Sequence, residues 1–199
     1  MARTWKFCEE IVLASASPRR LELLSAVADR ITVEPSDVDE STVSAGSPRA
    51  LVRELSRLKA LSVAARAENR GKVVIGADTV VYLDKLYGKP RDRADAIRML
   101  TELNGREHSV FTGVTVVRDG WTRTFSVRSA VKFRNMTAHE IEEYVDGHRP
   151  YDKAGAYAVQ EGVVVGSYRG SLTNIIGLPM EKLVKVLKEV QHGTDRTVR

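Results

Sequence analysis

The sequence has little cysteine, few aromatic residues and no long apolar run, and each shortage excludes a class of protein. The single cysteine, Cys8, allows no intramolecular disulfide and lacks the Cys and His neighbours of a zinc site. No apolar run approaches the ~20 residues of a membrane span, and the N-terminal residues contain no apolar segment of signal-peptide length. Aromatic residues make up 6% of the chain, whereas nucleic-acid surfaces often interleave aromatic with basic side chains. We therefore expect a cytoplasmic protein that neither enters a membrane nor binds nucleic acid stably.

Two familiar nucleotide-binding motifs are also missing. The two Gly-Lys pairs are followed by Val73 and Pro90, never by Ser or Thr, so there is no Walker loop. A Gly-x-Gly-x-x-Gly dinucleotide fingerprint is absent as well. None of the four histidines has the spacing of a metal ligand; they are His108, His139, His148 and His192.

Composition fits one ordinary globular domain, with either one lobe or two. The 199 residues are 43% hydrophobic and 29% charged, which is enough to bury a full core. Lys plus Arg exceed Asp plus Glu by 31 − 26 = 5, and the isoelectric point is about 9.4, so anionic partners are favoured. We expect a folded core at about residues 11–187 and flexible polar ends at 1–9 and 191–199.

Predicted helices and strands alternate along the chain. Apolar runs predict strands at residues 11–14, 31–34, 73–83, 110–117, 122–133 and 156–165. Capping signals predict helices that open at Ser17-Pro18, Ser47-Pro48, Asp92, Thr137 and Pro179, the last continuing through Leu187. The dipeptide Asp119-Gly120 predicts a tight hairpin. This order favours an α/β fold with a mixed sheet and flanking helices.

The segment from Ser15 to Arg20 is the first candidate for a ligand site. A strand that runs directly into a helix start leaves several backbone N–H groups unpaired, and the helix dipole makes that point attractive to anions. Two serines and two arginines add donors, and an arginine can bind a phosphate through two hydrogen bonds. An ordinary surface helix with Ser17 as its N-cap explains this segment equally well when it is taken alone.

Asp78 is the second candidate, because a carboxylate inside an apolar stretch is costly unless it is hydrogen-bonded, metal-bound or at an exposed strand end. Gly76 and Ala77 would leave room beside it for a ligand; a turn between two strands is the structural alternative. The acidic loop at residues 37–40, which ends in Glu40, could supply a second oxygen ligand to Mg²⁺. A solvated acidic turn is the commoner explanation for that loop.

Three further polar positions are weaker signals. Lys59 lies at the border of the helical stripe formed by Leu51, Leu55, Leu58, Ser62 and Ala65, where it could simply extend its charged end into water. Lys89 lies in a stiff loop between Gly88 and Pro90 and could equally be solvated. The segment at residues 152–160 combines Lys153 with Gln160, whose amide can both donate and accept, as reading a pyrimidine edge requires. A Gln facing water on an edge strand is an equal alternative.

Taken together, these segments resemble one family, the Maf-type nucleotide pyrophosphatases, which were first described as septum-formation inhibitors. The segments that carry the resemblance appear in the family's order along nearly the whole chain, at residues 14–24, 37–40, 76–81, 88–90, 112–114, 152–157 and 177–179. The resemblance implies an α/β fold related to the inosine-triphosphate pyrophosphatases, with a long mixed sheet, flanking helices and two lobes around a deep cleft. A homodimer is expected from the resemblance only.

The reaction implied by the resemblance is hydrolysis of a nucleoside triphosphate between its α and β phosphates, with Mg²⁺ or Mn²⁺ as cofactor. By position, the resemblance implies phosphate binding by Ser15, Arg19, Arg20, Lys59 and Lys89, and metal binding by Glu40 and Asp78. Asp78 is also the implied proton acceptor. Substrate choice is implied for Arg19, Thr79 and Gln160, and Lys153 is a further substrate-binding candidate.

The form of residues 152–160 resembles the branch of the family that acts on dTTP and UTP. Two departures, Ala158 where the branch usually has Gly and the shorter loop at Glu161-Gly162, lie beside Gln160 and concern base preference. Two other functions stay open. One is a basic nucleic-acid-binding or septum-regulating protein without turnover, and the other is a pyrophosphatase that removes the purine nucleotides ITP and XTP.

Overall fold

The computed structural model describes residues 5–194, and the side chains of residues 5–191 within them. In chain order the elements are β1 (Ile11–Leu13), α1 (Pro18–Ser25), β2 (Ile31–Val33), η1 (Glu40–Thr42), α2 (Pro48–Ala64), η2 (Ala67–Asn69), β3 (Val73–Tyr82), β4 (Leu86–Tyr87), α3 (Arg93–Leu103), β5 (Glu107–Arg118), β6 (Trp121–Phe133), α4 (Ala138–His148), η3 (Ala154–Ala156), η4 (Val159–Glu161), β7 (Val165–Arg169), α5 (Leu172–Ile176) and α6 (Met180–Thr194). The η elements are short 3₁₀ turns. No helix within this part of the chain is long and apolar enough to span a membrane.

The strands form one open, mixed sheet, as the sequence predicts. Its order is β2-β1-β3-β5-β6-β7, with β4 paired to β3. β1 runs parallel to β2 and β3, and every other pairing is antiparallel. The predicted hairpin joins β5 to β6: Asp119 and Gly120 have φ angles of 45° and 84°, both left-handed as a type I′ turn requires.

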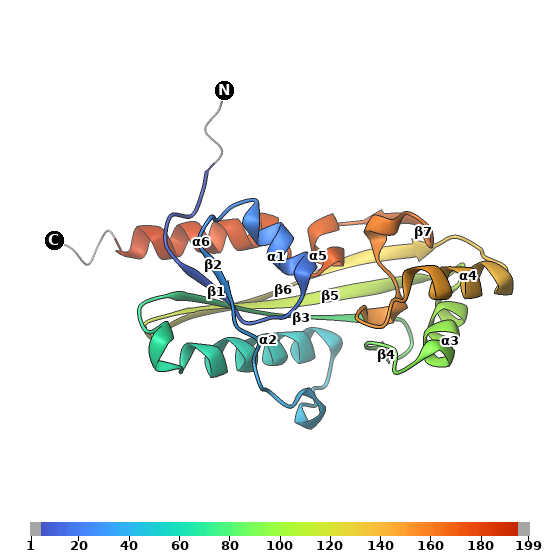
Figure 1. The fold of residues 1–199 in the computed structure, drawn as a ribbon, viewed down its shortest axis with the longest axis horizontal. Helices are drawn as coiled ribbons and strands as arrows, with labels where there is room; N and C mark the ends of the chain where they lie inside the picture. The colour runs from blue at the N-terminus through green and yellow to red at the C-terminus, as the bar shows by residue number, and fades with distance from the viewer. Residues whose placement is uncertain (1–4, 195–199) are drawn as a thin grey trace.

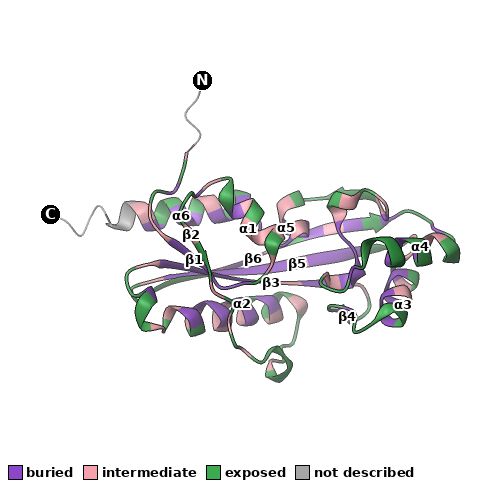
Figure 2. Ribbon diagram, in the orientation of Figure 1, coloured by how far each residue is buried: buried purple, intermediate pink, exposed green. Residues whose placement is uncertain are grey.

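Helices cover both faces of the sheet. Figure 1 shows α1, α5 and α6 along one face and α2 along the other, with α3 and α4 beside one end. One apolar core joins β1, β3 and β5 to α1 and α6, and a second joins the other end of the sheet to α3 and α4. A third, smaller core packs the inner face of α2 against β1, β3 and β5. The central strands and the inner face of α2 are buried in Figure 2. The first two cores, toward opposite ends of the sheet, give the molecule its two lobes.

β3 is one continuous strand, and part of its edge is uncovered. Residues 76–79 lie inside it rather than in a turn, which excludes the turn alternative for Asp78. On this edge, β1 pairs with β3 as far as Ile75, and β4 pairs from Val81 onward. No described strand covers the segment between these pairings. The uncovered segment is where the two lobes meet.

Helix α2 packs unusually close to β3 and β5. A Cβ added to Gly76 would lie 2.4 Å from the backbone oxygen of Ser56, and one added to Gly113 would lie 2.0 Å from that of Val52. The space beside Gly76 is therefore filled by helix backbone, and the expectation that it admits a ligand is wrong. The predicted stripe of α2 is also rotated: its buried residues are Val52, Leu55, Ser56, Lys59, Ala60 and Val63, while Ser62 and Ala65 are exposed.

Other sequence-based boundaries need correction. The strand predicted at residues 156–165 is wrong, because left-handed φ angles at Gly155, Ala156 and Gly162 turn the chain through η3 and η4. Strand β7 begins only at Val165. The final helix continues to Thr194. The core extends past its predicted limits to Phe7 and Val190, both buried; the outermost ends predicted to be flexible, 1–4 and 195–199, lie outside the described residues.

Candidate active site

A cleft of about 590 Å³ lies beside the uncovered edge of β3 and is lined from both lobes. It brings together every site residue predicted from the sequence, namely Ser15, Arg19, Arg20, Glu40, Lys59, Asp78, Thr79, Lys89, Lys153 and Gln160. These residues come from segments spread over nearly 150 positions of the chain. Their convergence is decided by the sheet order, because the end of β1 and the middle of β3 are neighbours.

One ammonium group joins two carboxylates at the centre of the cleft. Lys59 Nζ lies 2.6 Å from Asp78 Oδ1 and 2.7 Å from Glu40 Oε1. The side chains of Lys59 and Asp78 are only 10% and 9% exposed, whereas that of Glu40 is 55% exposed. Lys59 occupies the buried stripe of α2, and the solvated alternative for it is wrong. A buried pair of this kind is held by its charge and its hydrogen bond together.

Glu40 and Asp78 are the residues that could hold a divalent cation. Within residues 5–194 no group of three or more His, Cys, Asp or Glu side chains is arranged to hold a metal alone. Mg²⁺ sites in phosphoryl-transfer enzymes need less, because one or two carboxylates are completed by water and substrate phosphates. The two carboxylates already face a single positive charge on Lys59. The donor set therefore fits Mg²⁺ or Mn²⁺, both of which prefer oxygen ligands.

The Ser15–Arg20 segment forms the start of α1, as its sequence predicts. Pro18 is the first helical residue and Ser17 occupies the N-cap position. The Ser17 side chain makes no capping hydrogen bond, however; its backbone N–H donates to Ser15 Oγ at 3.3 Å. Predicting Ser17 as a side-chain cap is therefore wrong. Ser15, which is buried, provides the hydroxyl that organises this turn.

Arg20 is fixed by three hydrogen bonds to the protein. Its guanidinium donates to the Gly177 carbonyl (2.9 Å), to Ser15 Oγ (2.9 Å) and to Thr79 Oγ1 (3.1 Å). Burial lowers the pKa of Arg20, and the positive charge of Arg19 adds to the effect, while Asp78 opposes it. Three of its five N–H groups serve these bonds, so Arg20 offers the cleft a fixed positive charge and few remaining donors.

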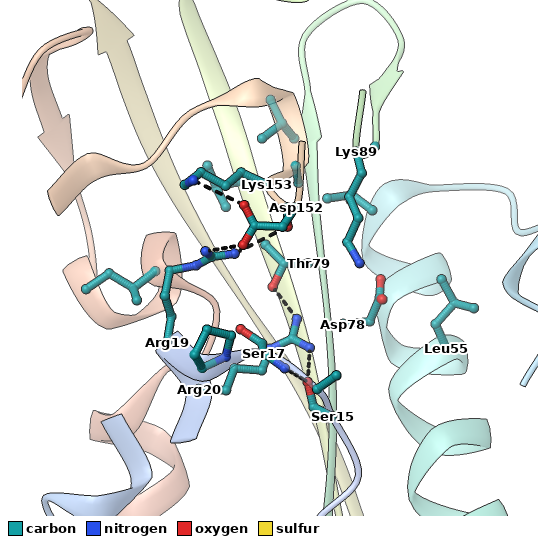
Figure 3. A pocket seen from close by; sticks show the side chains of 18 of the residues that line it. Ser15, Ser17, Arg19, Arg20, Leu55, Asp78, Thr79, Lys89, Asp152 and Lys153 are labelled. Atoms are coloured by element: carbon teal, nitrogen blue, oxygen red, sulfur yellow. Dashed lines mark hydrogen bonds and ion pairs between the residues drawn. The ribbon is translucent and has the colours of Figure 1, made fainter. Parts of the chain in front are cut away.

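Arg19 spans the cleft to the second lobe. Its Nη1 donates to Asp152 Oδ2 at 2.7 Å, and Asp152 also accepts from Lys153 Nζ at 3.1 Å. Although burial alone raises the pKa of Asp152, the hydrogen bonds from Arg19 and Lys153 outweigh it and hold that pKa below its usual value. Lys153 also lies 3.6 Å from Glu161. Two cations from different lobes are thus held around one carboxylate (Figure 3).

Lys89 and Gln160 reach the cleft from loops. Figure 3 shows Lys89 extending toward Asp78 from the other side of the cleft. Lys89 is exposed, as is Gln160, which lies on η4 rather than on a strand. The strand predicted for Gln160 is therefore wrong, although its side chain is exposed as the edge-strand alternative expects. Both residues are accessible to a ligand in the cleft.

Some residues of the site were not singled out from the sequence. Asp152, which lies next to Lys153 in the segment at residues 152–160, holds both Arg19 and Lys153. Thr112 and Asn174 are fully buried and hydrogen-bond behind Thr79. The capping pair Ser171 and Asn174 was a readable helix signal: the Ser171 hydroxyl accepts from the Asn174 N–H at 3.0 Å and opens α5. Nothing in the sequence linked Thr112 to Asn174.

The chain is similar to known proteins along nearly its whole length. The family model described as "Maf-like protein" matches residues 10–190. The chain is 44% identical over 181 residues to the dTTP/UTP pyrophosphatase of Thermosipho africanus, covering 89% of this chain and 92% of the relative. It is 43% identical over 187 residues to the protein of the same name from Syntrophus aciditrophicus, covering 92% and 90%. A third protein of that name, from Myxococcus xanthus, is 44% identical over 181 residues, covering 89% and 91%.

Proposed function

The chain belongs to the Maf-like protein family, and from that premise we propose that it hydrolyses dTTP and UTP to the monophosphate and pyrophosphate. The relatives of this chain are named for dTTP and UTP, and these are the two nucleotides that we propose as its substrates. The observation that carries it is the Lys59 ammonium between Asp78 and Glu40, in a cleft whose other walls bear Arg19, Arg20, Lys89 and Lys153. A triphosphate needs such a balance of cations and metal-binding oxygens.

The cations of the cleft suit the substrate's charge. A nucleoside triphosphate carries roughly four negative charges, and cleavage of the phosphoanhydride bond depends on neutralising them and on aligning the attacking water. Arg19 and Lys153 meet at Asp152 on one side of the cleft and Lys89 extends from the other (Figure 3), while Arg20 adds a charge fixed by its protein contacts. In this proposal they bind the phosphates and stabilise pyrophosphate as it leaves.

Glu40 and Asp78 would hold a divalent cation when the nucleotide binds. The cation supplies further neutralisation of the phosphate oxygens. Both carboxylates also contact Lys59 in this structure, so Lys59 keeps them close together at the place where the cation would bind. We propose Mg²⁺ or Mn²⁺ as that cation, because the available ligands are all oxygen.

Asp78 is the proposed proton acceptor. Lys59 bonds to its Oδ1, so Oδ2 is the oxygen left to orient the attacking water and take its proton. The position of the carboxylate is set by the strand and by Lys59, and a general base must be held within hydrogen-bond reach of the proton that it removes. Water then attacks the α phosphorus, the α–β bond breaks, and pyrophosphate departs. The proton that water loses resides on Asp78 until it is released.

The test is a nucleotide panel with the purified protein. Pyrophosphate release is measured from dTTP, UTP, CTP, GTP, ITP and XTP with Mg²⁺ and with Mn²⁺. We expect kcat/KM to be highest for dTTP and UTP. Preferential cleavage of ITP or XTP would favour the purine alternative. Failure to release pyrophosphate from any nucleotide would sink the enzyme proposal and favour a binding or regulatory role.

A further inference from the structure

Thr79 and Thr112 form a hydroxyl pair behind the cleft. They are directly opposite each other in the β3–β5 register, and their Oγ1 atoms are 3.0 Å apart. Thr79 is half-buried at the cleft wall, and Thr112 is fully buried. Two further hydrogen bonds end this short chain of hydroxyls: Arg20 Nη2 to Thr79 Oγ1 at 3.1 Å, and Thr112 Oγ1 to the Asn174 backbone carbonyl at 2.9 Å.

The groups at the two ends fix the direction of every hydrogen bond between them. A carbonyl oxygen can only accept, so the Thr112 hydroxyl proton points to Asn174. Thr112 is then an acceptor toward Thr79, and the Thr79 proton points to Thr112. A guanidinium can only donate, so Arg20 occupies one lone pair of Thr79. The relay runs one way, from Arg20 through Thr79 and Thr112 to Asn174.

A hydroxyl oriented in this way has no proton to offer a ligand. Thr79 retains one lone pair and faces the cleft as an acceptor only. It cannot donate to a phosphate oxygen, which is itself an acceptor. It suits a ligand group that carries an N–H.

We propose that Thr112 is a positioning residue that makes Thr79 an acceptor, and that Thr79 thereby selects pyrimidines with an N–H at ring position 3. Uracil and thymine carry a proton on N3, whereas cytosine presents an unprotonated, accepting N3. An acceptor facing another acceptor loses a hydrogen bond and leaves buried polar atoms unpaired, which disfavours cytosine. The inference rests on the proposed function and explains why one site takes both dTTP and UTP.

The test compares UTP with CTP as substrates of Thr112→Val and Thr112→Ser. Valine matches the shape of threonine without the hydroxyl, so Thr79 loses its acceptor and its proton can turn toward the cleft. We expect the UTP:CTP ratio of kcat/KM to fall by about 5-fold or more in Thr112→Val, the worth of roughly one hydrogen bond. Thr112→Ser keeps the hydroxyl and retains the wild-type ratio. A general loss of stability would lower both substrates together and leave the ratio unchanged.

A second measurement needs no variant and holds even if Thr112→Val fails to fold. Wild-type protein is assayed with 3-methyluridine triphosphate, which lacks the N3 proton, and with 3′-deoxyuridine triphosphate, which lacks a ribose hydroxyl. We expect the methylated base to be the poor substrate. If only the deoxyribose analogue is poor, Thr79 accepts from the ribose and the assignment to the base is overturned. Equal UTP:CTP ratios in wild type and Thr112→Val overturn the relay, while absence of all turnover overturns the proposed function itself.

Discussion

Asp78 and Thr79 are consecutive on β3, yet they face two different environments. Asp78 points to the α2 face, where it meets the charges of Lys59 and Glu40. Thr79 points to the face covered by α1 and α5, where its neighbours are the hydroxyl of Thr112 and the guanidinium of Arg20. Because side chains alternate along a strand, two adjacent positions serve two sides of one sheet.

The difference between the two faces is one of chemistry. The α2 face concentrates opposite charges around oxygens that can bind a metal or accept a proton. The opposite face arranges neutral hydroxyls in a fixed direction between Arg20 and Asn174. Charges supply large energies with little directional choice, whereas hydrogen bonds discriminate between donors and acceptors. We therefore expect changes to Asp78 and Lys59 to affect rate and stability, and changes to Thr79 and Thr112 to affect substrate choice.

Asp78→Asn provides the largest test of this division. The amide is nearly the same size as the carboxylate but cannot accept the proton from water, so we expect kcat for dTTP to fall by roughly 100-fold or more. Pyrophosphate release at saturating dTTP measures the effect. Asp84→Asn is the matched control, since Asp84 is an exposed carboxylate paired with Arg106. A decrease of less than ~10-fold in Asp78→Asn would show that Asp78 is not the general base.

Lys59→Met should reduce both rate and stability. Removing the ammonium leaves the buried Asp78 carboxylate without its partner, a change that costs about 3 kcal/mol of unfolding free energy. For a domain of this size that corresponds to roughly 6–12 °C in Tm. Thermal denaturation checks it. Lys85→Met is the control, because the Lys85–Glu102 pair is far more exposed and such pairs contribute about 1 kcal/mol or less. Equal Tm losses in the two variants would contradict the buried role.

Gly76→Ala tests the close packing that positions Lys59. The added Cβ would lie 2.4 Å from the Ser56 carbonyl oxygen, so α2 must move away from β3. Overpacking of this kind costs about 1–3 kcal/mol, and we expect both Tm and kcat to fall. Gly46→Ala is the control, since its Cβ would meet nothing within 4 Å and its φ lies outside the left-handed region. If Gly76→Ala behaved like Gly46→Ala, close approach of α2 would not be needed for activity.

The buried His108 on β5 is expected to make the stability of the fold depend on pH. Burial lowers the pKa of His108 to about 4, and its Nε2 lies 2.9 Å from the hydroxyl of Tyr157, a residue of the cleft wall. The unfolded chain, with a histidine pKa near 6.5, takes up the proton first as pH falls. Above about pH 7, His108 therefore has no effect on the free energy of unfolding. As pH falls from the unfolded-state pKa toward the folded-state pKa, that free energy decreases, by about 2 kcal/mol between pH 7 and pH 5.

The measurement is urea denaturation of wild type and His108→Gln at pH 7 and pH 5. We expect wild type to lose about 2 kcal/mol more between these pH values than His108→Gln does. His139→Gln, which changes an exposed histidine on α4, should keep the wild-type pH dependence. If wild type and His108→Gln lost the same free energy of unfolding between pH 7 and pH 5, His108 would not be the group that titrates. Substrate preference at pH 7 should not change in either variant.

Local signals predicted the element order well. Ser47 caps α2, Thr137 and Glu140 form the predicted capping box of α4, and Asp119-Gly120 makes the hairpin. These features depend on a few adjacent residues, so sequence reveals them. The strand predicted at residues 156–165 was wrong because apolar character alone does not report the left-handed conformations of Ala156 and Gly162. The burial of Phe7 was missed for a different reason: it depends on contacts with residues far along the chain.

The candidate residues were likewise recognisable one by one, but their partners were not. The apolar surroundings of Asp78 indicated a special carboxylate, yet Lys59 was assigned to the border of its helix because the stripe was centred on the leucines. Gly76 and Gly113 let α2 approach the sheet closely, and the side of the helix that faces the sheet is the one that carries Lys59. The bond between Arg19 and Asp152 joins residues 133 positions apart. No spacing rule predicts such a pair.

The sequence by itself determined most of the strands, the helices that begin at clear capping signals, the chemical groups that are present and the family that their order indicates. The tertiary structure decided which groups meet. It placed Lys59 between two carboxylates, because Gly76 and Gly113 let α2 approach the sheet. It also gave the Thr79 hydroxyl its direction, because Asn174 arrives from a distant helix with a carbonyl that can only accept. Bond direction and charge pairing depend on three-dimensional proximity, which a linear order of residues does not contain.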